Sequence, residues 1–285
     1  MVKLFTSVQV RECRIRISPS DRTVVLGSCF ADRMGLRMKE AGFDVCVNPF
    51  GTVYNPESLL GCIGRLDSGE HFTEDDCVEM GAGAGLVCSF HHHSSFARRD
   101  AQTFLSDANA ALDEAAAFWK GCSKVLITLG TAMVWRRGGQ TVSNCLKRPA
   151  AEFTHEMLTS SEVEGMLEKI VREHPDKEFV FTISPIRHLG EGAHSNQVSK
   201  ATLLLGLEAA LAAEPERTAY FPSYEILLDE LRDYRFYADD LCHPSETAAG
   251  IIWERFLESA VPGCEHEKIR EAEKESRRNR HIPLH

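Results

Sequence analysis

The sequence predicts an α/β fold: a single three-layer α/β/α sandwich with a parallel central sheet and small β-hairpin insertions. Short apolar runs without polar alternation recur along the chain, which is typical of strands buried on both faces of a parallel sheet. Amphipathic helical segments separate these runs, as the crossover connections between parallel strands require. No linker, repeat or low-complexity stretch divides residues 23–260, so one sheet accounts for that span.

Strands and helices are predicted to alternate along this span. Apolar runs predict strands at residues 23–27, 43–47, 125–131, 179–184 and 219–221. Apolar residues at helical spacing predict helices over residues 30–41, 58–66, 100–119, 161–171, 195–213, 224–232 and 244–256. Ser161 and Glu164 form the pattern of a capping box at the start of one helix, and Pro244 is placed to open the last one.

The remaining segments are assigned to insertions and termini. Residues 77–90 predict a hairpin around a glycine-rich turn, and residues 135–143 predict a second hairpin around a Gly-Gly turn. Residues 1–20 are expected to be irregular. We assign residues 1–262 to the domain and residues 263–285 to a charged C-terminal tail, expected as a solvated helix or a frayed end. The alternative for this tail is an arm that binds nucleic acid or a partner.

The composition narrows the class of protein. A hydrophobic content of 43% and a charged content of 26% are typical of a globular protein with a full core. The formal net charge of −10 argues against a nucleic-acid partner, which would require a basic face. No apolar run reaches the length of a membrane span or a signal peptide, so we expect no membrane association. The ten cysteines include no Cys-x-x-Cys pair, which favours reduced thiols in the cytoplasm.

The first predicted strand ends in Gly27-Ser28, and a helical pattern follows at once. A serine at this switch is close to the N–H groups of the first helical turn, where negative charge is favoured. A nucleophile and part of an oxyanion hole could therefore come from the same few residues. The alternative interpretation of Ser28 is a helix N-cap.

Polar side chains also follow the other predicted strands, at the edge where ligands bind to parallel sheets. These groups are the Asn48–Pro56 loop, Gly130-Thr131, the stretch 184–188, and Asp240 with His243 before the last helix. In a tight turn, residues three apart can place a carboxylate on imidazole Nδ1–H, which leaves Nε2 free for a serine hydroxyl. The sequence therefore predicts an Asp240–His243 pair that serves Ser28.

The stretch Gly27-Ser28-Cys29-Phe30-Ala31 resembles the name-giving motif of the GSCFA-domain family, which is grouped with the SGNH (GDSL-like) hydrolases. The resemblance covers about Leu26 to Phe256. Other stretches that resemble family signatures are residues 48–51, 126–132, 184–188, 199–203, 220–225 and 233–237.

This resemblance implies a flavodoxin-like sandwich of the SGNH-hydrolase type and a Ser-His-Asp triad. Ser28 matches the nucleophile, and Asp240 and His243 match the Asp-x-x-His of the last sequence block. The N–H groups of Ser28 and Gly51 are the candidates for the oxyanion hole.

One position departs from the wider SGNH pattern. After the position of Gly130-Thr131 an SGNH hydrolase usually has an asparagine, whereas this sequence has Ala132. Asn144 and Asn48 are the candidates for the missing donor, whose loss typically costs about 10²–10³ in rate. For the substrate we assign Asn48, Arg187, His188 and Thr131.

The resemblance implies an ester hydrolase or acyl transferase that acts on small O-acyl compounds, including acetylated carbohydrates, with neither cofactor nor metal. The alternative is a non-catalytic member that keeps the pocket as a carbohydrate- or anion-binding module, favoured by Ala132 and by the pair Arg187-His188.

Other residues have two interpretations each. Cys29 is a rival nucleophile at a helix N-terminus, or else a small apolar residue buried against the sheet. The pair Arg187-His188 binds substrate, or else holds the Asn48 loop. The run His91–His93 lines the cleft or lies on the surface, with a metal site as the weaker alternative. Phe236 and Tyr237 are expected to pack beneath the catalytic loop.

Overall fold

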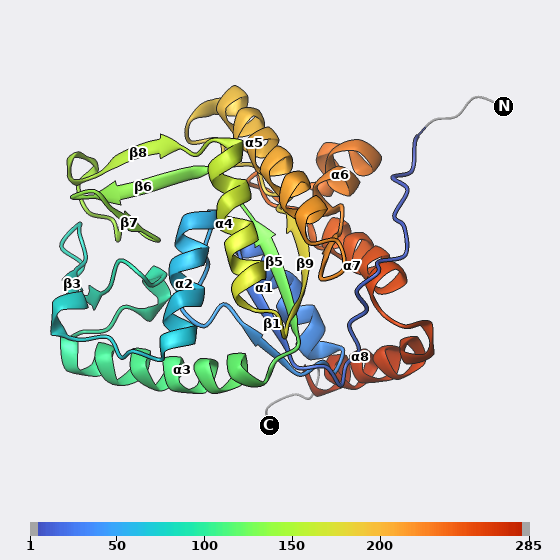
Figure 1. Cartoon of the computed structure of the whole chain (residues 1–285), viewed down its shortest axis with the longest axis horizontal. Coiled ribbons are helices and arrows are strands. Elements are labelled where there is room, and N and C mark those ends of the chain that lie inside the picture. Colours follow the sequence, from blue (N-terminus) through green and yellow to red (C-terminus); the bar gives the residue numbers. More distant parts are fainter. Residues whose placement is uncertain (1–4, 281–285) are drawn as a thin grey trace.

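The computed structural model describes residues 5–280, which form a three-layer α/β/α sandwich around a parallel sheet (Figure 1). The five strands of this sheet lie in the order β10-β9-β5-β1-β2. They are β1 (Thr23–Gly27), β2 (Val45–Val47), β5 (Lys124–Leu129), β9 (Glu178–Ile183) and β10 (Thr218–Tyr220). All neighbouring pairs are parallel, which is the flavodoxin-like order with its switch point between β1 and β5. The predicted fold class is confirmed.

Helices cover both faces of the sheet, because strand residues alternate between two buried clusters. Val24 and Leu26 face one cluster, whereas Val25 faces the other. The first cluster is covered by α2 (Pro56–Ser68), α3 (Ala101–Gly121), α4 (Ser160–Glu173) and α5 (Gly192–Ala213). The second is covered by α1 (Cys29–Glu40), α7 (Glu246–Ala260) and α8 (His266–Arg280).

The residues predicted to begin two of the helices, Ser161 and Pro244, are each wrong by two residues. The capping box of α4 is formed by Thr159 and Glu162, not by Ser161 and Glu164. Two overlapping Ser/Thr-x-x-Glu patterns occur there, and the sequence does not distinguish them. Helix α7 is capped by Ser245, whose hydroxyl accepts from the Ala248 N–H at 3.2 Å, so Pro244 lies outside the helix.

The segment after β10 also departs from a regular helix. It begins as the short α6 (Ser223–Glu225) and continues as a π-helical turn, η4 (Ile226–Leu231). Arg232 then ends this turn with a left-handed backbone at φ 46°.

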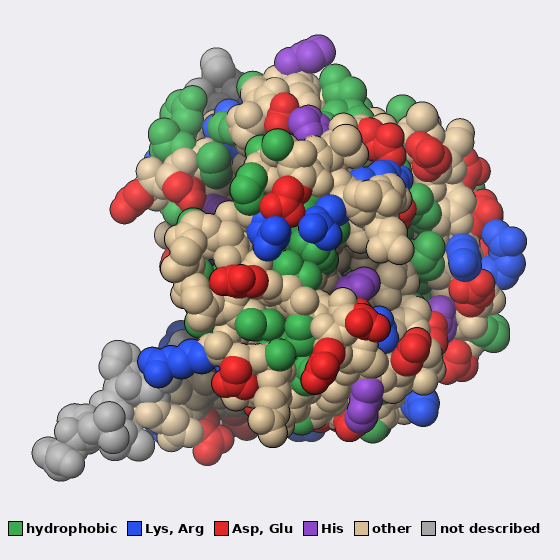
Figure 2. Space-filling view, turned by 90° about the vertical axis from the view of Figure 1, so that its left-hand side faces the viewer, with side chains coloured by type: hydrophobic (Ala, Val, Ile, Leu, Met, Phe, Trp, Pro, Cys, Tyr) green, Lys and Arg blue, Asp and Glu red, His purple; other side chains and the backbone are tan. Residues whose placement is uncertain are grey.

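The insertions lie beyond one side of the sandwich (Figure 1). Both predicted hairpins are confirmed, one as β3 (Val78–Glu79) with β4 (Val87–Cys88) and the other as β6 (Met133–Arg137) with β7 (Gln140–Val142). An unpredicted strand, β8 (Thr154–Met157), pairs antiparallel with β6. Short 3₁₀ turns complete the chain at η1 (Glu74–Asp76), η2 (Ser94–Phe96), η3 (Ala150–Glu152), η5 (Tyr234–Phe236) and η6 (Gly263–Glu265). On this side of the molecule, acidic and basic side chains are interspersed with hydrophobic ones (Figure 2).

The two ends of the described chain pack against the second cluster. The irregular N-terminal segment runs beside α7 (Figure 1), where the Cys13 N–H donates to the Ser259 carbonyl at 2.9 Å. The region predicted as a charged tail forms α8 up to residue 280, and Ile269 anchors this helix because its side chain is completely buried. Residues 281–285 of the predicted tail lie outside the described residues. None of the described helices has the length and apolar content needed to span a lipid bilayer.

His92 lies in the core between α3 and the Asn48 loop, which none of the interpretations of the histidine run anticipated. Its ring is fully buried among the rings of Phe50, Phe72, Phe96 and Phe104. Nδ1 is 2.7 Å from the Ser89 hydroxyl, whereas Nε2 has no partner among the described residues. Burial lowers the pKa of His92 to about 3.

We expect His92 to make the protein less stable in acid. The unfolded chain binds a proton near pH 6.5 and the folded chain does not, so stability falls as the pH drops below about 6.5. One such histidine lowers the free energy of unfolding by up to about 1.4 kcal/mol for each pH unit below this value. Urea unfolding of the wild type and of His92→Leu between pH 7 and pH 4 should therefore show a shallower pH dependence in the variant. Parallel curves would contradict this role.

Candidate functional site

Ser28 lies where β1 passes into α1, at the carboxyl edge of the sheet. Gly27 permits this turn with φ +134°, in a region that L-residues rarely adopt. Ser28 is the N-cap of α1, and its hydroxyl accepts a hydrogen bond from the Phe30 N–H at 3.3 Å. The side chain is completely buried. The N-cap interpretation is thus confirmed, and the nucleophile remains a prediction.

The oxyanion hole predicted from Ser28 and Gly51 is not formed in this structure. The Ser28 N–H donates to the Thr128 carbonyl at 3.2 Å, and the Gly51 N–H donates to the Asn48 carbonyl at 2.7 Å. Both donors are therefore occupied by backbone acceptors. Residue 51 is a glycine for a steric reason, because a Cβ at this position would lie 2.2 Å from His93 Cβ.

Each of the two asparagines considered as replacement donors is hydrogen-bonded within the protein, Asn144 through its oxygen. Asn144 Oδ1 accepts from the Leu146 N–H at 2.9 Å, in the turn that follows β7. Asn48 is 7% exposed; its Oδ1 accepts from the Gly27 N–H at 2.8 Å, and its Nδ2 donates to Asp32 at 2.5 Å. Asn48 thus fixes the loop after β2 to the end of β1, which corrects its assignment to substrate binding.

Asp240 and His243 form the hydrogen-bonded pair that their spacing predicts. Asp240 Oδ2 is 2.5 Å from His243 Nδ1, and Asp240 Oδ1 accepts the N–H groups of Cys242 and His243, each at 2.9 Å. These backbone donors, followed by the imidazole, lower the pKa of Asp240 to about 2. A carboxylate on Nδ1 leaves Nε2 as the free ring nitrogen of His243.

The loop that carries this pair is tied to both neighbouring segments of the sheet edge. Arg33, in the second turn of α1, donates to the Pro244 carbonyl at 3.0 Å. Arg187, after β9, donates through its N–H to the Cys242 carbonyl at 3.1 Å and through its guanidinium to the Leu241 carbonyl at 3.2 Å. The guanidinium also lies 5.7 Å from the Tyr237 ring centre. Arg187 therefore holds the His243 loop, rather than the Asn48 loop.

Ser28 and His243 approach the same edge without bonding to each other. Among residues 5–280, no hydrogen bond joins their side chains; the Ser28 hydroxyl oxygen accepts from the Phe30 N–H within its own helix. Of the predicted triad, the structure shows the Asp240–His243 pair and a separate, buried Ser28.

His188 lies beside Ser28 on the other side of Gly130. A Cβ built on Gly130 would be 3.3 Å from Ser28 Cβ and 3.4 Å from His188 Nε2. The His188 N–H donates to Asn196 Oδ1 at 2.9 Å, and its ring meets Tyr54 edge-on at 5.9 Å. Burial, with smaller contributions from Lys200 and His243, lowers the pKa of His188 to about 4.

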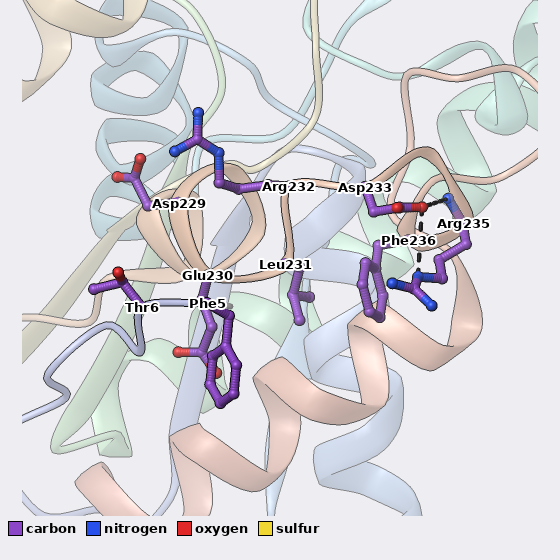
Figure 3. A pocket seen from close by; sticks show the side chains of 9 residues that line it. All are labelled: Phe5, Thr6, Asp229, Glu230, Leu231, Arg232, Asp233, Arg235 and Phe236. Carbon is purple, nitrogen blue, oxygen red and sulfur yellow. Dashed lines mark hydrogen bonds and ion pairs between the residues drawn. The ribbon is translucent and has the colours of Figure 1, made fainter. Parts of the chain in front are cut away.

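A cavity of about 370 Å³ adjoins this cluster. The substrate residues predicted at Thr131, Arg187 and His188 line it, together with Trp135, Asn196 and Ser199. A larger cavity of about 770 Å³ lies between the N-terminal segment and η4–η5, and no predicted site residue lines it (Figure 3). There, Asp233 and Arg235 pair with each other, as Figure 3 shows.

Sequence reasoning gave no role to Ser199 or Lys200, although both support this edge. The Ser199 hydroxyl accepts the Ala132 N–H at 2.8 Å and lies 2.9 Å from the Thr131 hydroxyl. Lys200 is 1% exposed and donates to the carbonyls of Gly130 at 2.6 Å and Ser184 at 2.8 Å. Burial lowers the pKa of Lys200 to about 7. The sequence did contain a signal for Lys200: it lies on the same face of its helix as Leu203 and Leu207, which indicates a buried lysine.

Two other candidates have contacts that differ from those expected. Cys29 packs against the second cluster but is only half-buried, and its Sγ lies 3.4 Å from the Tyr54 hydroxyl. In the histidine run, His93 Nδ1 is 3.0 Å from the Ser95 hydroxyl, while His92 is in the core. No group of three His, Cys, Asp or Glu side chains within residues 5–280 is arranged to hold a metal ion.

The protein is therefore an open parallel α/β sandwich, and its polar residues gather at the carboxyl edge of the sheet, near the switch point between β1 and β5. The chain belongs to the GSCFA family, whose model matches residues 22–256. This span contains Ser28, the Asp240–His243 pair and Lys200. No curated protein shows a significant match to the sequence.

Proposed function

We propose that the chain is a serine-dependent ester hydrolase or acyl transferase of the SGNH type. Its substrates are small O-acyl compounds, including acetylated carbohydrates, and it works in the cytoplasm. The observation that carries the proposal is the Asp240–His243 hydrogen bond of 2.5 Å, at the edge of the sheet where Ser28 ends β1. The cavity bordered by Thr131 and His188 provides room for the substrate beside it.

In this reaction the Ser28 hydroxyl attacks the acyl carbon, and its proton passes to Nε2 of His243. Asp240 holds the opposite ring nitrogen and stabilises the imidazolium that forms. His243 then returns the proton to the leaving alkoxide, which gives an acyl-serine and a free alcohol. Water or an acceptor hydroxyl attacks the acyl-serine in the second half and loses its proton to His243, which then passes it to the departing Ser28 oxygen and releases the acyl product. The first step requires the Ser28 hydroxyl, which is completely buried here, to become accessible to His243 and to the substrate.

A second candidate function is a non-catalytic member that binds a carbohydrate or an anion. The buried Ser28 hydroxyl and the occupied N–H groups of Ser28 and Gly51 favour it. In that case Thr131, Arg187 and His188 would contact the ligand, and ester turnover would be absent.

Hydrolysis of p-nitrophenyl acetate by the wild type and by Ser28→Ala separates the two candidates. The esterase proposal expects a loss of at least about 10³-fold in kcat, because the nucleophile is removed. Thr159→Ala is the matched control, since it removes the N-cap of α4 on another helix and costs about 1 kcal/mol of stability without touching the site. Equal turnover in wild type and Ser28→Ala would overturn the esterase proposal. Inactivation by iodoacetamide that Cys29→Ser abolishes would instead identify a thiol nucleophile.

A further inference from the structure

His188 carries a buried polar atom for which the described residues provide no partner. Nε2 is shielded from solvent and forms no hydrogen bond, although the ring is packed against Tyr54 and its backbone N–H is bound to Asn196. An unsatisfied buried polar group costs about 1–3 kcal/mol, so native proteins retain few of them. Such an atom at a ligand-binding edge is explained when a ligand supplies its partner.

The atom lies close to Ser28. His188 Nε2 and Ser28 Cβ both lie against Gly130, 3.4 Å and 3.3 Å from the position that a Cβ on Gly130 would take. Residue 130 is a glycine because a Cβ there would also lie only 2.9 Å from the Tyr54 carbonyl oxygen. It lies at the start of the segment Gly130-Thr131-Ala132, where Ala132 supplies no side-chain donor.

The surroundings keep the ring of His188 uncharged. Burial lowers its pKa to about 4, and the neighbouring ammonium of Lys200 acts in the same direction. Lys200 is itself fixed, because it bridges the carbonyls of Gly130 and Ser184, which follow the two adjacent strands β5 and β9. A neutral imidazole at pH 7 carries one N–H, which can donate a hydrogen bond without undergoing a charge change.

We propose that His188 Nε2–H is the side-chain donor that binds the substrate carbonyl oxygen at Ser28, in the role that Ala132 cannot perform. Lys200 is the positioning residue that holds Gly130 and Ser184 on either side. This inference rests on the proposed acyl chemistry of Ser28. His188 exchanges no proton in the reaction: it donates to the carbonyl oxygen in the ground state and more strongly to the oxyanion, while His243 transfers the proton.

The kinetic test compares His188→Leu, which removes the donor, with His188→Gln, which retains an N–H donor at the end of a longer side chain. We expect His188→Leu to lower kcat for p-nitrophenyl acetate by about 10²–10³-fold with KM little changed, and His188→Gln to recover part of this loss. His174→Leu is the matched control, because His174 is another buried histidine, near the opposite edge of the sheet and bound to Asp67. Its kcat should equal that of the wild type.

A second readout does not depend on turnover. Long-range ¹⁵N–¹H correlation spectra of the folded wild type at pH 7 report which ring nitrogen of His188 carries the proton. We expect the neutral tautomer with hydrogen on Nε2. A lone pair on Nε2 overturns the donor role, whatever the activity.

The outcomes separate this inference from the proposed function. Turnover that depends on Ser28 but is unchanged in His188→Leu overturns the inference alone. Equal loss in His188→Leu and His188→Gln, with KM raised rather than kcat lowered, also overturns it, since it indicates only a packing role. A wild type without Ser28-dependent turnover overturns the proposed function, and the inference with it.

Discussion

Replacing Asp240 by asparagine is expected to lower kcat by about 10⁴-fold with the fold unchanged. The amide oxygen of the introduced side chain can still accept the N–H groups of Cys242 and His243, so the turn should persist. Its NH₂ group would then face His243 Nδ1 and favour the tautomer that carries hydrogen on Nε2. That tautomer cannot take a proton from Ser28, and the imidazolium loses its carboxylate. Steady-state kinetics with p-nitrophenyl acetate measures the loss.

Asp233→Asn is the matched control for this substitution. Asp233 closes a similar turn upstream in the chain, where its Oδ1 accepts the Arg235 N–H at 3.0 Å. It has no histidine partner among the described residues, so kcat should stay within about twofold of wild type. The pKa of about 2 adds a second expectation: Asp240 stays ionised across the working range and does not cause an acid limb in the pH–rate profile. Equal rates in Asp240→Asn and Asp233→Asn would refute the proposed role of Asp240.

The largest expected loss of stability follows from Gly27→Ala. A Cβ at this position would lie 2.1 Å from the Thr128 carbonyl oxygen, within the β1–β5 pairing. Both atoms belong to rigid backbone, and the φ of +134° adds strain for any L-residue. We expect a decrease of more than about 4 kcal/mol in the unfolding free energy, or failure to fold, measured by urea unfolding.

Gly64→Ala provides the opposite expectation in the same chain. Gly64 lies within α2, and nothing lies within 4 Å of the Cβ that alanine would add. Alanine should stabilise the protein by about 0.5–1 kcal/mol, because it restricts the unfolded chain and favours the helix. A Gly27→Ala protein as stable as Gly64→Ala would show that the close approach of β1 and β5 has been misjudged.

The parts of the fold that the sequence predicts well are those with a periodic local signal. The strand predicted at 23–27 is observed as Thr23–Gly27, and the helix predicted at 100–119 is observed as Ala101–Gly121. Strand β8 was missed because Thr154–Met157 is mostly exposed and becomes a strand only by pairing with β6. The π-helical turn at Ile226–Leu231 was missed for a related reason, since its apolar spacing also fits an α-helix.

The site shows the same division between local and distant contacts. The Asp240–His243 pair was predictable because the two residues share one turn. The state of the oxyanion donors was not predictable, because the Ser28 N–H is occupied by the Thr128 carbonyl, which belongs to another strand. Lys200 was missed because its partners, Gly130 and Ser184, are brought to it only by the parallel pairing of β5 and β9.

The central claim is that Ser28 is the nucleophile, and covalent trapping tests it most directly. The folded protein is treated with a p-nitrophenyl alkylphosphonate, and the modified residue is located by peptide mass mapping. We expect one adduct, on Ser28, that is absent in Ser28→Ala and formed much more slowly in His243→Ala. An adduct on Cys29 or elsewhere, or an unmodified Ser28 after release of p-nitrophenol, would contradict it.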